Sequence, residues 1–102
     1  MEFVQERLKG YEKHGVVVSN FSMHWRDGKA FCGLLHQKNP NLFDWNVVMK
    51  ANPTENLNRA FDLGLKHYGI PKLLDAEDIT DMPRPDSKSI ITYLSLVRQK
   101  LL

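Results

Sequence analysis

Residues 53–68 (PTENLNRAFDLGLKHY) restrict the fold more than any other part of the chain, because their apolar residues recur at the period of an α-helix. The spacing i, i+3, i+4, i+7, i+8, i+11 is occupied by Leu57, Ala60, Phe61, Gly64, Leu65 and Tyr68. Residues with this spacing share one face of a helix. Asn52 is a good N-cap before Pro53, Glu55 completes a capping-box-like pattern, and Gly69 can end the helix. The stretch therefore predicts a capped amphipathic helix with one buried face.

Two other stretches predict long helices by the same reasoning. The last helix is expected to begin at Asp86, a good N-cap, and to bury a stripe formed by Ile90, Ile91, Leu94, Val97 and Leu101. A central helix is expected from about Asp27, which can cap the first-turn amides, to the stop at Asn39-Pro40. Its apolar face would comprise Ala30, Phe31, Leu34 and Leu35.

The remaining segments predict a first helix and several short elements. The first helix is expected from Met1 to about Lys13, with an apolar stripe of Phe3, Val4, Leu8 and Tyr11. Residues 44–49 predict one or two helical turns, and residues 75–79 predict a short capped helix. Residues 16–18 (VVV) are interpreted as an extended loop on the core, because no partner strand is evident.

The composition places the chain among ordinary globular domains and excludes several partner classes. It has 102 residues, of which 42% are hydrophobic and 25% charged, as expected for one globular domain. The net charge of +2 gives no strong electrostatic footprint for nucleic acid, so nucleic acid is not an expected partner, although the charge leaves room for a locally basic patch. Cys32 is the one cysteine, which fits a reducing cytoplasm. No signal-peptide pattern or membrane-spanning apolar run is present.

Residues 24–36 (HWRDGKAFCGLLH) raise the question of a metal or nucleophile site. Cys32 and His36 are four residues apart and could face one ion, but zinc needs at least a third ligand, and no paired ligand motif occurs. Cysteine catalysis needs a histidine within hydrogen-bond distance, which the spacing does not establish. Packing is therefore the favoured interpretation of Cys32, and Trp25 and Trp45 are expected as core anchors. No metal, cofactor or enzyme activity is predicted, which leaves a binding or scaffold module.

A series of motifs in register resembles the calponin homology domain. Asn20-Phe21 and residues 25–28 (WRDG) precede residues 30–36 (AFCGLLH), as in the central helix region of these domains. The resemblance continues through residues 40–45 (PNLFDW), 56–61 (NLNRAF) and 70–79 (IPKLLDAEDI). Residues 84–95 (RPDSKSIITYLS) are most similar to the second domain of the tandem pair in the α-actinin, spectrin, filamin and dystrophin group. The resemblance covers about residues 3–101.

The resemblance implies an all-α fold, a compact bundle of four main helices with short connecting helices. It also implies a non-catalytic F-actin-binding module of the cytoskeleton. Within such a tandem, this domain would be the weaker, regulatory half beside an adjacent calponin homology domain. The chain is expected to be a single domain over residues 1–102, excised from a larger protein. The alternative is a signalling or phosphoinositide-binding single calponin homology module.

The resemblance also carries candidate binding residues onto this sequence. Second domains of the family contact actin through their first helix, which by match is about Glu2–Lys13. The implied actin-binding residues are Gln5, Glu6, Arg7, Lys9 and Lys13. A phosphoinositide site near the following loop would use Lys9, Lys13, His14 and Lys38 to attract anionic phospholipid. The sequence departs from the family at Phe3, where tryptophan is frequent, and in the basic run before Pro53, which is reduced to Lys50.

Overall fold

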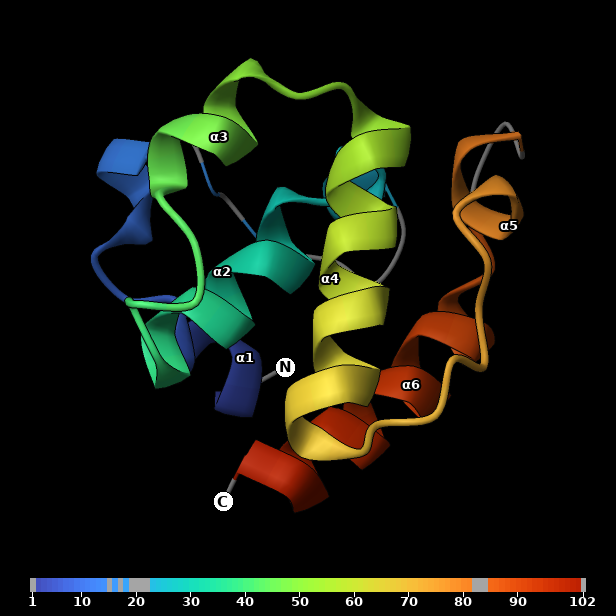
Figure 1. The fold of residues 1–102 in the computed structure, drawn as a ribbon. Helices are drawn as coiled ribbons and strands as arrows, with labels where there is room; N and C mark the ends of the chain where they lie inside the picture. Colours follow the sequence, from blue (N-terminus) through green and yellow to red (C-terminus); the bar gives the residue numbers. More distant parts are fainter. Residues whose placement is uncertain (1, 15, 17, 19–22, 82–84, 102) are drawn as a thin grey trace.

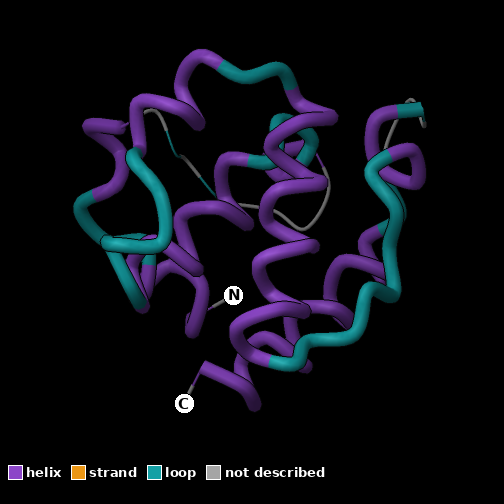
Figure 2. The backbone as a smooth tube through the Cα atoms, viewed as in Figure 1, coloured by secondary structure: helices purple, strands orange, loops and turns teal. Residues whose placement is uncertain are grey.

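The computed structural model describes residues 2–14, 16, 18, 23–81 and 85–101 (Figure 1). Regular secondary structure in this described part is entirely helical (Figure 2), which confirms the predicted all-α fold. The elements are α1 (Glu2–Arg7), the 3-10 helices η1 (Tyr11–His14) and η2 (Met23–Trp25), α2 (Lys29–Lys38), α3 (Trp45–Lys50), α4 (Pro53–Tyr68), α5 (Glu77–Thr80) and α6 (Ser87–Leu101). The Asn20-Phe21 motif lies outside the described residues.

Helix α4 begins and ends where its sequence predicts. Asn52 Oδ1 accepts a hydrogen bond from the Glu55 backbone N–H at 2.9 Å, and Asn52 Nδ2 donates to Glu55 Oε1 at 2.7 Å. At the other end Gly69 has φ +66°, which ends the helix in the left-handed conformation. Both signals act within a few residues of the helix, so they operate whatever packs around it.

Two helices organise the bundle. The most extensive contact between elements joins α2 and α4, which cross near the middle of the molecule (Figure 1). Helix α2 also contacts α1, α3 and η2, whereas α4 contacts α5 and α6. The N-terminal elements are therefore held by α2 and the C-terminal elements by α4.

An aromatic cluster fills the space between α2, α4 and α6. The ring of Phe31 lies 4.7 Å from the Trp25 ring, 5.4 Å from that of Phe61 and 5.6 Å from that of Tyr93, measured between centroids. Trp25 is fully buried and Trp45 is 8% exposed, which confirms both tryptophans as core residues. Burial of such rings is the main favourable term in holding the helices together.

The predicted first helix is wrong in its length. Helix α1 ends at Arg7 rather than near Lys13, and the chain turns at Gly10, where φ is +92°, before η1 begins. Glycine adopts this conformation without the penalty of a Cβ atom. The turn directs Tyr11 towards Trp45, with 5.5 Å between ring centroids. A straight helix would have carried this tyrosine in another direction.

Two residues of the predicted apolar stripes are not buried. Leu65 in α4 is 49% exposed and Ile91 in α6 is 43% exposed. Each lies at the edge of its apolar stripe, where no described element packs over it. Tyr93, which the α6 stripe omitted, is 3% exposed and belongs to the aromatic cluster. The short helices at residues 44–49 and 75–79 are confirmed as α3 and α5, but the predicted cap of α5 is wrong, because its N-cap residue is Ala76 and no side chain caps it. Val16 is buried as predicted, but Val17 lies outside the described residues.

Candidate functional site

The residues that suggested metal or nucleophile chemistry make separate contacts. The Cys32 thiol is fully buried and donates to the backbone oxygen of Asn56 at 3.3 Å. Burial raises its pKa to about 12, which keeps it protonated near neutrality. His36 instead faces η1, with its Nδ1 atom 2.8 Å from the Tyr11 hydroxyl. Among the described residues, no group of three or more His, Cys, Asp and Glu side chains is arranged to hold a metal ion.

A buried asparagine joins the start of α2 to α4 and was not singled out by the sequence. Asn56 is 1% exposed, and its Nδ2 donates to the backbone oxygens of Val48 at 3.1 Å and Asp27 at 3.3 Å. Its Oδ1 accepts from Arg59 Nη1 at 2.8 Å. A buried amide must be satisfied in this way, since an unpaired polar atom destabilises the fold. Its position next to Leu57, on the predicted buried face of α4, was the one indication of burial in the sequence. Its hydrogen-bond partners are known only from the packing of α3 and the start of α2 against α4.

The cleft beside this network is lined by groups that already hold the fold. It lies between the η2–α2 turn and the start of α4, and its lining includes Arg26, Asp27, Asn52 and Thr80. Arg26 Nη2 donates to the Thr80 backbone oxygen at 3.1 Å. Asp27 Oδ1 accepts from the Lys29 N–H at 3.0 Å and so binds a first-turn amide of α2 as predicted, although the N-cap residue of this helix is Gly28. These polar groups make structural contacts within the domain.

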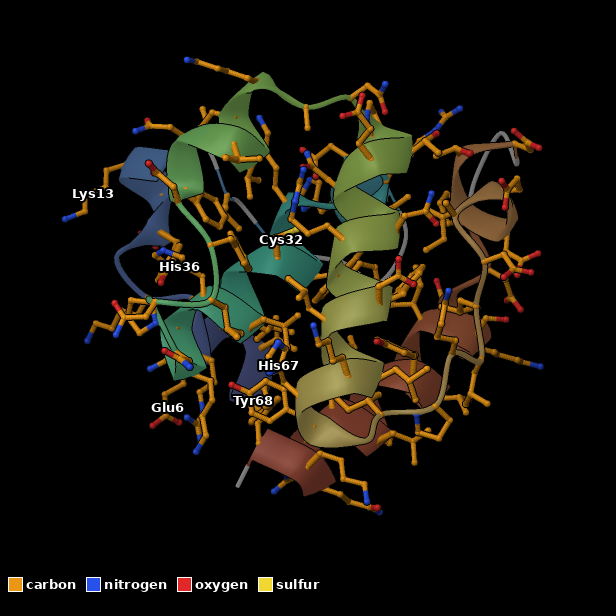
Figure 3. All side chains as sticks on the ribbon, in the orientation of Figure 1. Glu6, Lys13, Cys32, His36, His67 and Tyr68 are labelled. Carbon is orange, nitrogen blue, oxygen red and sulfur yellow. The ribbon has the colours of Figure 1, made fainter. Side chains whose placement is uncertain are left out.

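The predicted actin-binding residues lie on α1, η1 and the turn between them, here called the α1–η1 surface. Its members Gln5, Glu6, Lys9 and Lys13 are exposed, whereas Arg7 is half-buried. In Figure 3, Glu6 and Lys13 mark the two ends of the α1–η1 surface, and the Lys13 side chain points away from the molecule. Gln5 Nε2 donates to the Val18 backbone oxygen at 3.2 Å, which ties α1 to the following loop.

Contacts with α2 hold the α1–η1 surface in place. Gly33 lets the residue after α1 approach α2 closely, because a Cβ atom built at Gly33 would lie 2.7 Å from Leu8 Cδ2. Arg7 Nη1 donates to Gln37 Oε1 at 3.4 Å. Together with the Tyr11–His36 contact, these interactions fix the orientation of α1 and η1 against the last turns of α2. The exposed side chains therefore project from a supported backbone.

The residues predicted to attract phospholipid are distributed over this same region. Lys9 and Lys13 are exposed on the α1–η1 surface, and Lys38 is exposed at the end of the neighbouring helix α2. The side chain of His14 lies outside the described part. Glu12 stands between the lysines in sequence, and its Oε2 accepts from the Gly10 N–H at 3.0 Å. The structure thus places three of the four predicted cations on adjoining elements, with a carboxylate among them.

Comparison with known proteins identifies the family. The sequence model of the calponin homology (CH) domain matches residues 1–101. This chain belongs to the calponin homology domain family. The motif resemblance and the all-helical structure agree with that assignment. No helix in the described part of this calponin homology domain is both long enough and apolar enough to span a membrane.

The relatives that match this calponin homology domain include α-actinins. The chain is 48% identical over 80 residues to alpha-actinin of Dermatophagoides farinae. It is 49% identical over 80 residues to human alpha-actinin-1 and to mouse alpha-actinin-3. Each match covers 78% of this chain but only 9% of the relative. The chain therefore spans a small part of the length of the relatives it matches.

Proposed function

We propose that this calponin homology domain is a non-catalytic, F-actin-binding module of the cytoplasmic cytoskeleton. The observation that carries the proposal is the family match over residues 1–101, together with 49% identity to human alpha-actinin-1 over 80 residues. The buried, high-pKa thiol of Cys32 is poorly suited to nucleophilic chemistry, which favours a binding role.

Within this function, the domain acts as the weaker, regulatory second half of a tandem pair. The similarity of residues 84–95 to second domains supports this role. Its partners are then F-actin, contacted through the α1–η1 surface, and an adjacent calponin homology domain that supplies most of the affinity. The exposed charges of Lys9 and Lys13 suit long-range attraction to an acidic partner, because rim charges raise the rate of association.

Co-sedimentation with F-actin tests this function. The chain would be assayed alone and fused behind a first calponin homology domain. We expect weak pelleting of the lone chain and markedly stronger pelleting of the tandem. Tight binding by the lone chain would overturn the subordinate role. The actin assignment itself would be refuted if neither form pelleted with filaments.

Charge-reversal variants test where the filament is contacted. Lys9→Glu and Lys13→Glu each reverse an exposed cation on the α1–η1 surface, and each is expected to weaken actin binding about fivefold. Lys66→Glu is the matched control, since Lys66 is an exposed cation on α4 and the change in net charge is the same. Equal losses in all three variants would show a net-charge effect and would remove the α1–η1 surface from the proposal.

Phosphoinositide binding is a second candidate, favoured by the placement of Lys9, Lys13 and Lys38 on adjoining elements. Basic residues near an anionic headgroup each contribute about 1 kcal/mol. Flotation with phosphatidylcholine vesicles, with and without a phosphoinositide, measures this binding. The double variant Lys9→Glu/Lys13→Glu should abolish any phosphoinositide-dependent flotation. Flotation that is independent of the phosphoinositide, or unchanged in the variant, would contradict this second function.

A further inference from the structure

Two arginines from opposite ends of the chain converge on one aromatic ring. Arg7, at the end of α1, lies over the Phe3 ring with its guanidinium carbon 5.5 Å from the ring centroid. Arg98, in the last turn of α6, lies over the same ring at 6.0 Å. Both distances are within the range of cation–π attraction. The ring of Phe3 therefore connects α1 to α6 and has one guanidinium group from each helix within this range, where α1 and the end of α6 lie near each other in Figure 1.

Neither arginine is neutralised by a described carboxylate. The ion pair found among the described residues joins Lys72 to Asp62, at a different part of the surface. The hydrogen bond of Arg7 goes to the neutral amide of Gln37. Arg98 is exposed, and its described interaction is the one with the ring. The Phe3 ring thus supports two guanidinium groups that retain their capacity to bind an anion.

Helix stability explains only part of this arrangement. Both arginines occupy the last turn of a helix, where the negative end of the helix dipole favours a cation. That effect accounts for a positive charge at each helix end, but not for the convergence of the two charges on one ring. Two cations beside one ring, with no described carboxylate paired to either, favour a partner of opposite charge at this place.

We propose that Arg98 belongs to the filament-binding surface and that, together with Arg7, it receives acidic side chains of the actin filament. This inference rests on the proposed actin-binding function and extends the α1–η1 surface onto α6. A guanidinium group can bind a carboxylate through two parallel hydrogen bonds. The cation–π contact with Phe3 restricts both side chains beforehand, which reduces the entropy lost on binding. Such a fixed pair suits the ordered carboxylates of a protein surface better than a fluid layer of lipid headgroups.

Co-sedimentation of charge variants in the tandem form tests the role of Arg98. Arg98→Glu is expected to weaken binding to F-actin about fivefold, whereas Lys66→Glu should change it less than about twofold. The two positions are matched, because each is an exposed cation in the last turn of a helix. Arg98→Gln removes the charge without reversing it and should weaken binding about twofold. Its affinity should also depend less steeply on salt, which a purely structural role would not produce.

The outcomes separate this inference from the function on which it rests. Arg98 is excluded from the surface if Arg98→Glu and Lys66→Glu bind alike while Lys9→Glu binds weakly. Both ideas fail if the unmodified tandem does not pellet with filaments. Thermal unfolding establishes whether each variant is folded. If Arg98→Glu does not fold, the actin affinity of Arg98→Gln tests the role of Arg98 instead. A loss of flotation with phosphoinositide vesicles, without a loss of actin binding, would assign the arginine pair to a membrane and overturn the proposal.

Discussion

The replacement Gly28→Ala tests how closely α2 and α4 approach each other. Gly28 has φ +76°, and a Cβ atom added there would lie 2.7 Å from Asn56 Cβ, 2.8 Å from the Leu57 backbone N and 3.0 Å from the Asn56 backbone C. Two of these neighbours are backbone atoms of α4, which cannot move aside as the end of a flexible side chain can. The added methyl group therefore forces the start of α2 and the first turn of α4 apart.

The expected loss of stability has two components. A left-handed conformation costs a non-glycine residue about 1–2 kcal/mol. Overpacking a close contact costs about 1–3 kcal/mol more. Gly28→Ala should therefore lower the free energy of unfolding by about 2–5 kcal/mol, a large part of the roughly 5–15 kcal/mol typical of a domain.

Gly69→Ala is the matched control, because it separates the two components. Gly69 has φ +66°, but a Cβ atom there meets nothing within 4 Å. Its replacement should cost only the conformational component, about 1–2 kcal/mol. Urea unfolding followed by circular dichroism measures both variants, and a loss of 3 kcal/mol moves the midpoint by about 1–3 M. The reasoning is refuted if the two variants lose the same stability to within about 0.5 kcal/mol.

Three further measurements test the network and the caps. Asn56→Ala leaves the Val48 backbone oxygen without its 3.1 Å donor and should cost about 2 kcal/mol in urea unfolding, whereas the exposed Asn58→Ala should cost less than about 0.5 kcal/mol. Asn52→Ala removes the cap of α4 and should cost about 1 kcal/mol by the same assay; an unchanged midpoint would contradict the capping role. The pKa of Cys32 is raised from 9.0 to about 12, so the folded state retains a proton that the unfolded state releases, and this contribution to stability is complete below pH 9 and is lost as pH rises towards 12. Unfolding free energies measured from pH 8 to 11 should therefore fall less steeply for Cys32→Ala than for the unmodified chain, and parallel curves would refute the assignment.

Local signals were sufficient to predict the long helices. Helix α4 was predicted from Asn52 to Gly69, because its cap residues and its period are all contained within one short window of sequence. The start of α6 was equally local, since Asp86 Oδ1 accepts from the Lys88 N–H at 3.2 Å and Asp86 Oδ2 accepts from Ser89 Oγ at 2.9 Å. The end of α2 at Lys38, with Asn39 as an extended C-cap, follows from Pro40, which comes directly after Asn39.

The first helix shows where local signals were insufficient. Its apolar residues continue at helical spacing beyond Gly10, so the sequence alone favoured one helix to about Lys13. The tertiary structure ends α1 at Arg7, because the turn at Gly10 allows Tyr11 to pack against Trp45 and to reach His36. Packing on α3 and the end of α2 outweighs the weak preference for continuing the helix.

The candidate site divides in the same way. The sequence by itself determined the long helices α4 and α6 with their capping residues, and the family, and it predicted which charged residues of the first helix would be available to a partner. Only the tertiary structure decided that Asn56 is buried and that Arg7 and Arg98 both lie beside the ring of Phe3. Caps and periodicity act between residues a few positions apart, whereas these contacts join segments distant in the chain. Such contacts exist only after the helices have packed.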